Sequence, residues 1–137
     1  MSRQTHVFVG TDQPVEAVMA VLENALDRKF IHEEGSDPYI RLGSVAIYIG
    51  PHEFDDDDIA FNDGSPIPLH SQYPCWIEVR DTEKDLQRQE AVAWQVFDVL
   101  KAAGKWPLVL IDDMQHLIDS YDPADPRQAH ARQATIL

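Results

Sequence analysis

The chain has 137 residues and a mass of 15.6 kDa, with 44% hydrophobic and 9% aromatic residues, which is enough for one folded domain with its own core. This composition excludes a wholly disordered chain, and no apolar run approaches the roughly 18 residues of a membrane-spanning helix. Few consecutive apolar residues follow the polar start, so no secretory signal is predicted. Because the single cysteine, Cys75, cannot form an internal disulfide, a cytoplasmic location is expected. Without a long apolar run, no membrane partner is expected either.

Negative charge is concentrated in two stretches of the sequence. The formal net charge is −13, from 24 acidic and 11 basic residues. Residues 51–63 and 112–125 together carry 11 of the acids and no Lys or Arg, which leaves a charge of only −2 on the rest of the chain. Such a field repels nucleic-acid phosphates and anionic lipids and attracts basic proteins or cations, so no nucleic-acid partner is expected. The same charge would also suit a surface that only keeps the protein in solution.

The first half of the chain predicts strands around one amphipathic helix. Residues 6–9 have the pattern of a short strand, and the helix-start residues 11–14 introduce a helix over 14–28. Residues 29–33 predict a second strand. Residues 39–49 alternate strongly but change phase at Gly43-Ser44, which indicates either a two-residue hairpin turn or a bulge in one bent strand. The apolar stripe of the helix consists of Val15, Val18, Met19, Leu22, Ala25 and Leu26.

The second half begins with a long polar segment over residues 51–74. Residues 75–79 then alternate as a strand, and Asp81-Thr82 are expected to cap a long helix over 83–103 that ends at Gly104. The apolar run 107–111 is typical of a buried strand. Residues 123–137 lack periodicity and predict a mobile polar tail. Partial order of the polar segment is expected from Ile59, Phe61, Ile67, Leu69 and Tyr73, and a short helix from the spacing of Met114, Leu117, Ile118 and Tyr121.

This order of elements predicts a single α+β domain over residues 1–122. We expect a mainly antiparallel sheet of four to six strands with the two main helices on one face. If residues 39–49 are one bent strand, the order is the ferredoxin-like (split βαβ) arrangement. A true hairpin at Gly43-Ser44 adds a strand to the sheet and weakens that match.

No metal site and no cofactor are predicted. The acids at 55–58 invite a calcium interpretation, but counting from Asp55 places Ala60 and Pro66 where an EF-hand loop needs glycine and a final acid. The apolar strand before Asp112-Asp113 resembles a magnesium-binding segment of nucleotide hydrolases, yet no phosphate-binding loop accompanies it. Asp112 and Asp113 are therefore expected to cap a following helix.

No catalytic residue is predicted either. Cys75 alternates with Ile77 and Val79, which favours a core position over a nucleophile. The six histidines are dispersed and lack the helical spacing of a zinc motif. Around His52 and His70, the surrounding acids are expected to favour the charged form.

The leading hypothesis is a non-catalytic binding or inhibitory module for a basic protein surface. Aromatic residues around the acidic segment would either anchor such a partner or pin the segment to the sheet. In size and charge alone, the chain resembles bacterial immunity proteins and antitoxins, which cover a basic toxin. Two other hypotheses are a ligand-binding domain or enzyme with a pocket between the sheet and residues 51–74, and a homodimer paired through its sheets. The proposed partner-binding residues are Glu53, Phe54, Asp55, Asp56, Asp57, Asp58, Phe61, Asp63, Asp112 and Asp113.

Overall fold

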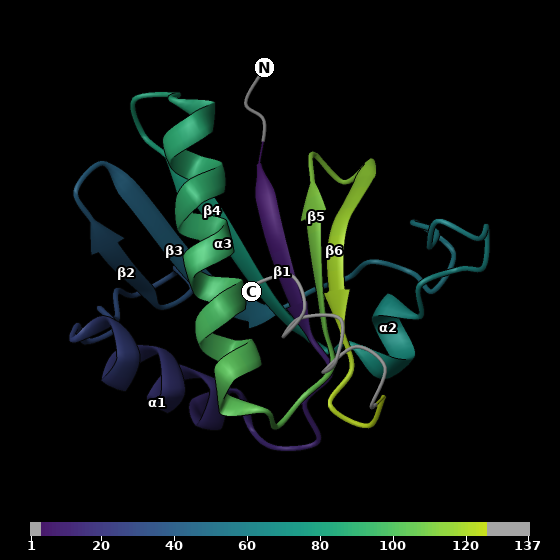
Figure 1. The fold of residues 1–137 in the computed structure, drawn as a ribbon. Helices are drawn as coiled ribbons and strands as arrows, with labels where there is room; N and C mark the ends of the chain where they lie inside the picture. Colours follow the sequence, from purple (N-terminus) through teal and green to yellow (C-terminus); the bar gives the residue numbers. More distant parts are fainter. Residues whose placement is uncertain (1–3, 126–137) are drawn as a thin grey trace, which may run out of the picture.

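Six strands form one sheet in the computed structural model, which describes residues 4–125 of the chain (Figure 1). The strands lie in the order β2-β3-β4-β1-β5-β6, and every neighbouring pair is antiparallel. The predicted α+β class and antiparallel sheet are confirmed. In chain order the elements are β1 (Thr5–Val9), α1 (Val15–Leu26), β2 (Tyr39–Leu42), β3 (Val45–Pro51), α2 (Leu69–Gln72), β4 (Cys75–Asp81), α3 (Leu86–Ala103), β5 (Leu108–Asp112) and β6 (His116–Tyr121).

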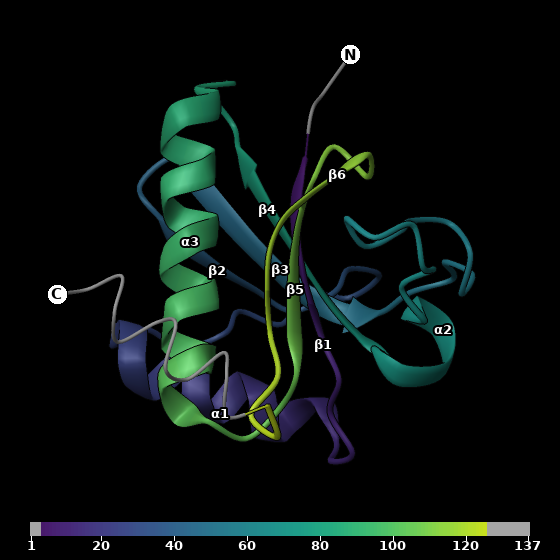
Figure 2. The same cartoon turned by 45° about the vertical axis from the view of Figure 1, so that its right-hand side comes forward.

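Helices α1 and α3 cover the same face of the sheet, as the sequence predicted (Figure 2). Helix α3 contacts α1 as well as the strands beneath it, which explains why its apolar sector is wide. None of the described helices is long and apolar enough to cross a membrane. The buried core on this face includes Val7, Val18, Leu22, Ile47, Ile77, Ala93, Val96, Phe97, Leu100 and Leu110.

The starts of the two main helices differ from the predicted caps. Helix α3 is capped by Asp85, whose carboxylate accepts a hydrogen bond of 3.1 Å from the Arg88 N–H, and not by Asp81-Thr82. Before α1, the Thr11 hydroxyl accepts a bond of 2.9 Å from the Gln13 N–H and so closes a turn ahead of the helix. The left-handed Gly104, with φ 66°, ends α3 as predicted.

Gly43 and Ser44 form a two-residue turn between β2 and β3, because Leu42 pairs with Val45 across them. Gly43 has φ 62°, the left-handed conformation that such a turn requires and that side chains disfavour. Strand β4 lies between β1 and β3, and β1 lies between β4 and β5. However, the hairpin strand β2 and the strand β6 extend both edges, so the match to a four-stranded ferredoxin-like order weakens as anticipated.

Residues 29–33 do not form the predicted strand. Among them Ile31 makes one isolated bridge with Tyr39, and its side chain is 44% exposed. Phe30 is buried instead, and its N–H donates to the Glu23 carboxylate at 2.8 Å. Of the two apolar residues Phe30 and Ile31, only Phe30 therefore joins the core, and the stretch between α1 and β2 is not a strand.

The short helix predicted around Met114 is a β-turn followed by a strand. Asp113 and Met114 occupy the centre of the turn between β5 and β6, with φ of 53° and 52°. The Gln115 N–H closes the turn by donating to the Asp112 carbonyl at 3.0 Å. Asp112 and Asp113 therefore lie in a hairpin and cap no helix, which corrects the sequence prediction.

A β-bulge explains why β6 imitates helical spacing. The pairing register shifts between Leu110 and Ile111, which leaves Ile118 as an extra residue in β6. Because the bulge resets the alternation, Ile118 and Tyr121 both pack with the helix-side core, whereas Leu117 packs on the opposite face. Of the tail predicted over 123–137, residues 126–137 lie outside the described part of the chain.

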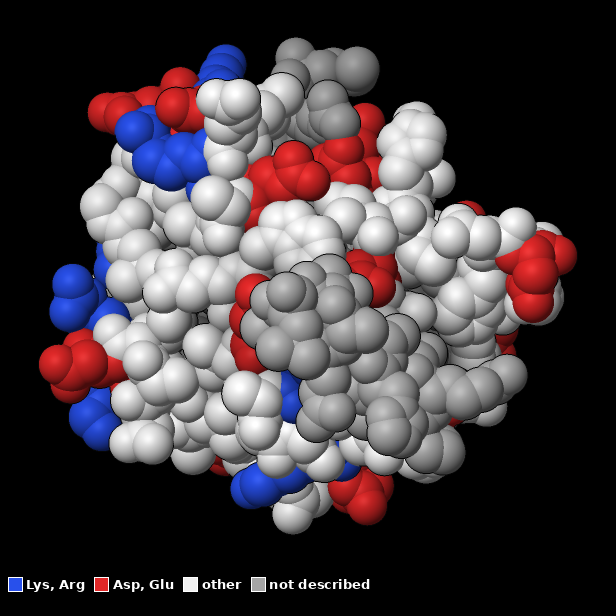
Figure 3. Space-filling model, in the orientation of Figure 1, with Lys and Arg blue, Asp and Glu red and all other residues white. Residues whose placement is uncertain are grey.

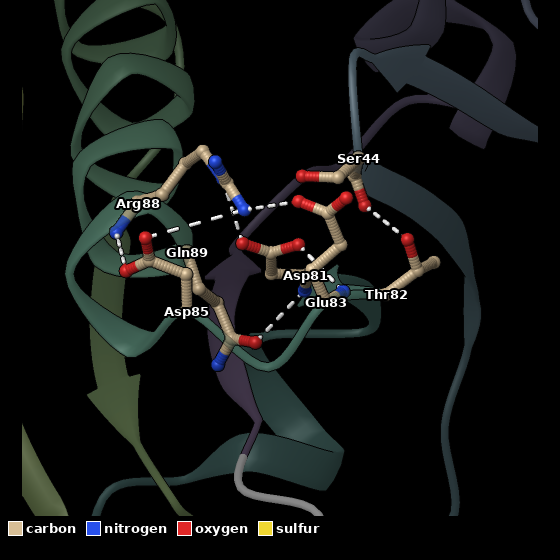
Figure 4. A network of polar contacts seen from close by, with 7 residues as sticks. All are labelled: Ser44, Asp81, Thr82, Glu83, Asp85, Arg88 and Gln89. Carbon is tan, nitrogen blue, oxygen red and sulfur yellow. Dashed lines mark hydrogen bonds and ion pairs between the residues drawn. The ribbon is translucent and has the colours of Figure 1, made fainter.

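Asp81, at the end of β4, joins α3 to the sheet (Figure 4). Its buried carboxylate accepts hydrogen bonds from Arg88 Nε at 2.8 Å and from the Glu83 N–H at 2.9 Å. Next to it, Thr82 donates from its hydroxyl to the Ser44 carbonyl at 2.8 Å, which ties the β2–β3 hairpin to the same corner. The bonds from Arg88 and Glu83 satisfy the buried charge of Asp81. The corner as a whole holds the structure together.

Gln89 completes the corner from inside α3. Its side-chain oxygen accepts the N–H of Asp81 at 2.9 Å, and its amide nitrogen donates to the Thr5 hydroxyl at 3.2 Å. One buried amide therefore connects α3 to both β4 and β1, and the start of the helix is fixed over the centre of the sheet.

We expect Asp81→Asn to lower the free energy of unfolding at neutral pH and to have less effect in acid. Burial alone would raise the pKa of Asp81, but hydrogen bonds from Arg88, Glu83 and Ser44 lower it from 3.8 to about 2. A carboxyl group whose pKa is lowered by folding stabilises the folded state above its unfolded pKa, and the effect is lost as the pH falls through the folded pKa. In urea unfolding, the difference between the two proteins should narrow between pH 3.8 and about 2.

The exposed Asp12 provides the control, since Asp12→Asn should change the free energy of unfolding little at any pH. The role assigned to this carboxylate would be contradicted if the wild-type protein and Asp81→Asn differed in free energy of unfolding by the same amount throughout the acid range.

Candidate functional site

Residues 52–74, which contain the acids of the first acidic stretch, leave the sheet after β3 and return to it at β4. Pro51 pairs with Cys75, so the two ends of this connecting segment, residues 52–74, are neighbours in the sheet. It lies with α2 on the sheet face opposite α3 (Figure 2). Its apolar residues pack on the outward side chains of β1 and β5, and the predicted partial order is therefore real. The second core cluster contains Phe8, Ile59, Ile67, Leu69, Tyr73, Val109 and Ile111.

His52 closes the base of the connecting segment. Its Nε2 lies 2.7 Å from the Tyr73 carbonyl oxygen, and its Nδ1 accepts a 3.1 Å bond from the Phe54 N–H. A carbonyl can only accept and an N–H can only donate, so Nε2 faces an acceptor and Nδ1 faces a donor. The ring joins the start of the segment to its end.

Asp55, Asp57 and Asp58 form an acidic tip at the outer end of this segment. All three are exposed, and one carboxylate oxygen from each lies within 4.8 Å of the others. The Asp58 carboxylate also accepts the Asp55 N–H at 2.9 Å, which holds the turn. Within residues 4–125, none of the three forms an ion pair with Lys or Arg. Exposed acids gather in this way without an ion, so the cluster does not by itself argue for a metal.

Two other predicted acids are used to shape the segment. Asp56 accepts the Ser71 N–H at 2.8 Å, and this bond lowers the pKa of its carboxyl group. Asp63 accepts from both the hydroxyl and the N–H of Ser65, at 2.6 and 2.9 Å, with the same effect on its pKa. Glu53 is exposed at the start of the segment. All the acids of this segment are exposed, but Asp56, Asp58 and Asp63 also accept hydrogen bonds that hold its turns.

The second acidic stretch begins in the hairpin turn between β5 and β6. Asp112 and Asp113 sit in the hairpin turn at one end of the sheet, where the Asp113 N–H donates to the Gln4 carbonyl at 2.7 Å. On the face seen in Figure 3, acidic side chains form separate patches divided by uncharged surface. The two stretches also share a buried cluster, because Met114 and Leu117 pack on the same core as Ile59 and Phe61. In the connecting segment, the pKa of Tyr73 is raised by burial and further by the charge of Asp122.

The predicted aromatic residues hold the connecting segment to the sheet. The half-buried Phe54 ring stands edge-on to Phe8 at 5.7 Å and to His6 at 6.3 Å between centroids. Phe61 is half-buried against the same core. Of the two roles considered for Phe54 and Phe61, the contacts support pinning the segment, and both residues are only partly buried.

Sequence reasoning missed a polar row on this face of the sheet. Glu78 of β4 pairs in register with His6 of β1, and its carboxylate lies 3.8 Å from His6 Nε2 and 3.3 Å from Arg80. Burial would raise the pKa of Glu78, but His6 and Arg80 together lower it. The strand alternation contained a local signal, because polar residues alternate with core residues along β4. The pairing partner, however, depends on the strand order.

Three buried polar atoms near this row have no partner among the described residues: His6 Nδ1, Trp76 Nε1 and Arg80 Nε. The Trp76 ring stacks on the His6 ring, with 5.5 Å between centroids. Beside Trp76 lies a pocket of about 440 Å³, in the region proposed for a pocket between the sheet and the acidic segment. It is lined by Pro51, His52, Glu53, Phe54 and Trp76.

Known proteins resemble neither the chain nor its fold closely enough to assign a function. No family model matches, and no curated protein or solved structure matches significantly. The connecting segment and the sheet face beneath it therefore form the candidate site of this protein.

Cys75 does not contribute to this site. Its side chain is 0% exposed at the start of β4, and burial raises the pKa of the thiol to about 12. A thiol that stays protonated and covered cannot act as a nucleophile near neutral pH. The core position predicted from its alternation agrees with these observations.

Proposed function

We propose that the protein is a non-catalytic binding module that places its acidic tip on a basic surface of a partner protein. The observation that carries the proposal is the arrangement of Asp55, Asp57 and Asp58: exposed, gathered within 4.8 Å, and without a described Lys or Arg to neutralise them. Charges arranged in this way raise the rate of encounter with an oppositely charged surface and pair with its Arg and Lys side chains.

The base of the connecting segment supports the same proposal. Four buried apolar residues fix the segment to the second core, and His52 ties its two ends together. A binding surface that is already ordered loses less conformational entropy when the partner arrives. Asp112 and Asp113, which lie in the turn between β5 and β6, are assigned to the long-range field around the protein. The immunity-like role rests on size and charge only and names one class of partner, a basic toxin.

Replacement of Asp55, Asp56, Asp57 and Asp58 by Asn is expected to slow association with the partner by about tenfold or more at low salt. Asn keeps the carbonyl oxygen that accepts the Asp55 and Ser71 N–H groups, so the segment should keep its shape. The dependence of the rate on ionic strength should also flatten, because screening already weakens the field beyond about 8 Å at physiological salt. The partner is first captured on the immobilised wild-type protein, and association is then followed by stopped-flow at several salt concentrations.

The matched control removes the same charge from other parts of the surface and should slow association much less. If both variants slowed association equally, the acidic tip would be no more than part of the general charge, and the pocket beside Trp76 would become the better candidate. The control substitutions are Asp12→Asn, Glu16→Gln, Glu34→Gln and Glu90→Gln, all at exposed positions.

A further inference from the structure

The pocket beside Trp76 has a chemistry that differs from the rest of the surface. Its lining combines the rings of His52, Phe54 and Trp76 with the carboxylate of Glu53, and it contains no Lys or Arg. Both nitrogens of the His52 ring are engaged by backbone groups, Nε2 by the Tyr73 carbonyl and Nδ1 by the Phe54 N–H. Glu53 is the only Asp, Glu, Lys or Arg residue among those that line the pocket.

The rings of this pocket are fixed by neighbours on the sheet. Trp76 stacks on His6 at 5.5 Å, and Phe54 packs edge-on against Phe8 at 5.7 Å. Glu53, by contrast, is exposed and makes no ion pair within the described chain. Rigid ring faces beside an unpaired carboxylate attract a cation through the ring quadrupole and through direct charge pairing.

We propose that this pocket receives the guanidinium group of an arginine from the basic partner. The inference rests on the proposed function and names the anchor that the partner inserts. A guanidinium is planar, so it can stack on an aromatic face while its N–H groups pair with a carboxylate, whereas an ammonium is a strongly hydrated point charge. The pocket at residues 51–54 directly precedes the acidic tip in the chain, so one basic segment can engage both.

The test uses a small probe and the isolated protein. N-acetyl-arginine amide is titrated into the 15N-labelled protein, and the indole N–H signals of Trp76, Trp94 and Trp106 are followed by NMR. Trp94 and Trp106 belong to the helix-side core and serve as internal controls. We expect a saturable shift of the Trp76 signal, assigned with a Trp76→Phe variant. The neutral isostere N-acetyl-citrulline amide should bind at least about threefold more weakly, and the lysine analogue should be intermediate.

Charge-matched variants separate the pocket from the general field. Glu53→Gln removes an exposed charge without touching the core and should weaken the arginine probe about two- to fivefold. Glu90→Gln removes an equally exposed acid from α3 and should leave its affinity unchanged. The inference would be overturned if the arginine and citrulline probes bound equally well, or if all three tryptophan signals shifted equally. It would also be overturned if Glu53→Gln bound the arginine probe as tightly as the wild-type protein. Because the probe needs no partner, such a failure would leave the acidic-tip proposal standing, to be judged by the four-Asn variant alone.

Discussion

Phe97→Ala is expected to lower the free energy of unfolding by about 3–5 kcal/mol, the usual loss for a buried aromatic side chain truncated to a methyl group. Phe97 is 0% exposed on the inner face of α3 and stands edge-on to Trp94 with 5.7 Å between ring centroids. It lies where α3 packs on both the sheet and α1, so the surrounding elements cannot collapse freely into the space it leaves. Urea unfolding followed by circular dichroism measures the loss.

Asp57→Ala is the surface counterpart and should change the free energy of unfolding by no more than about 0.5 kcal/mol. Asp57 is exposed in the acidic tip, and within residues 4–125 its side chain forms no hydrogen bond or ion pair. If this substitution proved more damaging than Phe97→Ala, the division into core and acidic surface would be wrong.

Cys75 is expected to react with an aromatic disulfide reagent at least about 1,000-fold more slowly in the folded protein than in the unfolded chain. The thiolate is the reactive form, and burial raises the pKa of this thiol from 9.0 to about 12, which lowers the thiolate fraction. The side chain is also 0% exposed, so the reagent must wait for the structure to open.

The labelling is followed by absorbance at mildly alkaline pH, with and without guanidinium chloride, and Cys75→Ser provides the blank. Prompt labelling of the folded protein would show that the start of β4 opens readily. Cys75 would then again be a candidate nucleophile.

Strong local periodicity was enough to predict most of the fold. The stripe of α1, the wide sector of α3 and the alternation of β4 each depend on side chains within one element, so the pattern and the structure agree. Prediction failed at β6, where a bulge at Ile118 turned strand alternation into apparent helical spacing. It also failed at the cap of α3, since Asp81 and Asp85 are both good capping residues. Asp85 accepts the Arg88 N–H as the cap, whereas the Asp81 carboxylate accepts from the Arg88 side chain.

The candidate site was predictable in charge but not in arrangement. The concentration of acids at 53–63 is visible in the sequence, and their exposure follows from their chemistry. Two features were not visible: that Glu78 lies opposite His6, and that Phe54 packs on Phe8. Both depend on β1 being the neighbour of β4, a pairing across most of the domain that no local pattern encodes.

The adjoining ends of the connecting segment also affect how this protein could diversify. Because Pro51 and Cys75 are already partners in the sheet, an insertion, deletion or exchange between them leaves the strand register untouched. The segment is not a free appendage, however, since Ile67 and Leu69 cover Val109 and Ile111, and a graft without such residues would uncover apolar sheet. The outer turn, with its charge and the binding proposed for it, could therefore be changed by evolution or design. Each new sequence would need apolar residues that cover the sheet as Ile67 and Leu69 do.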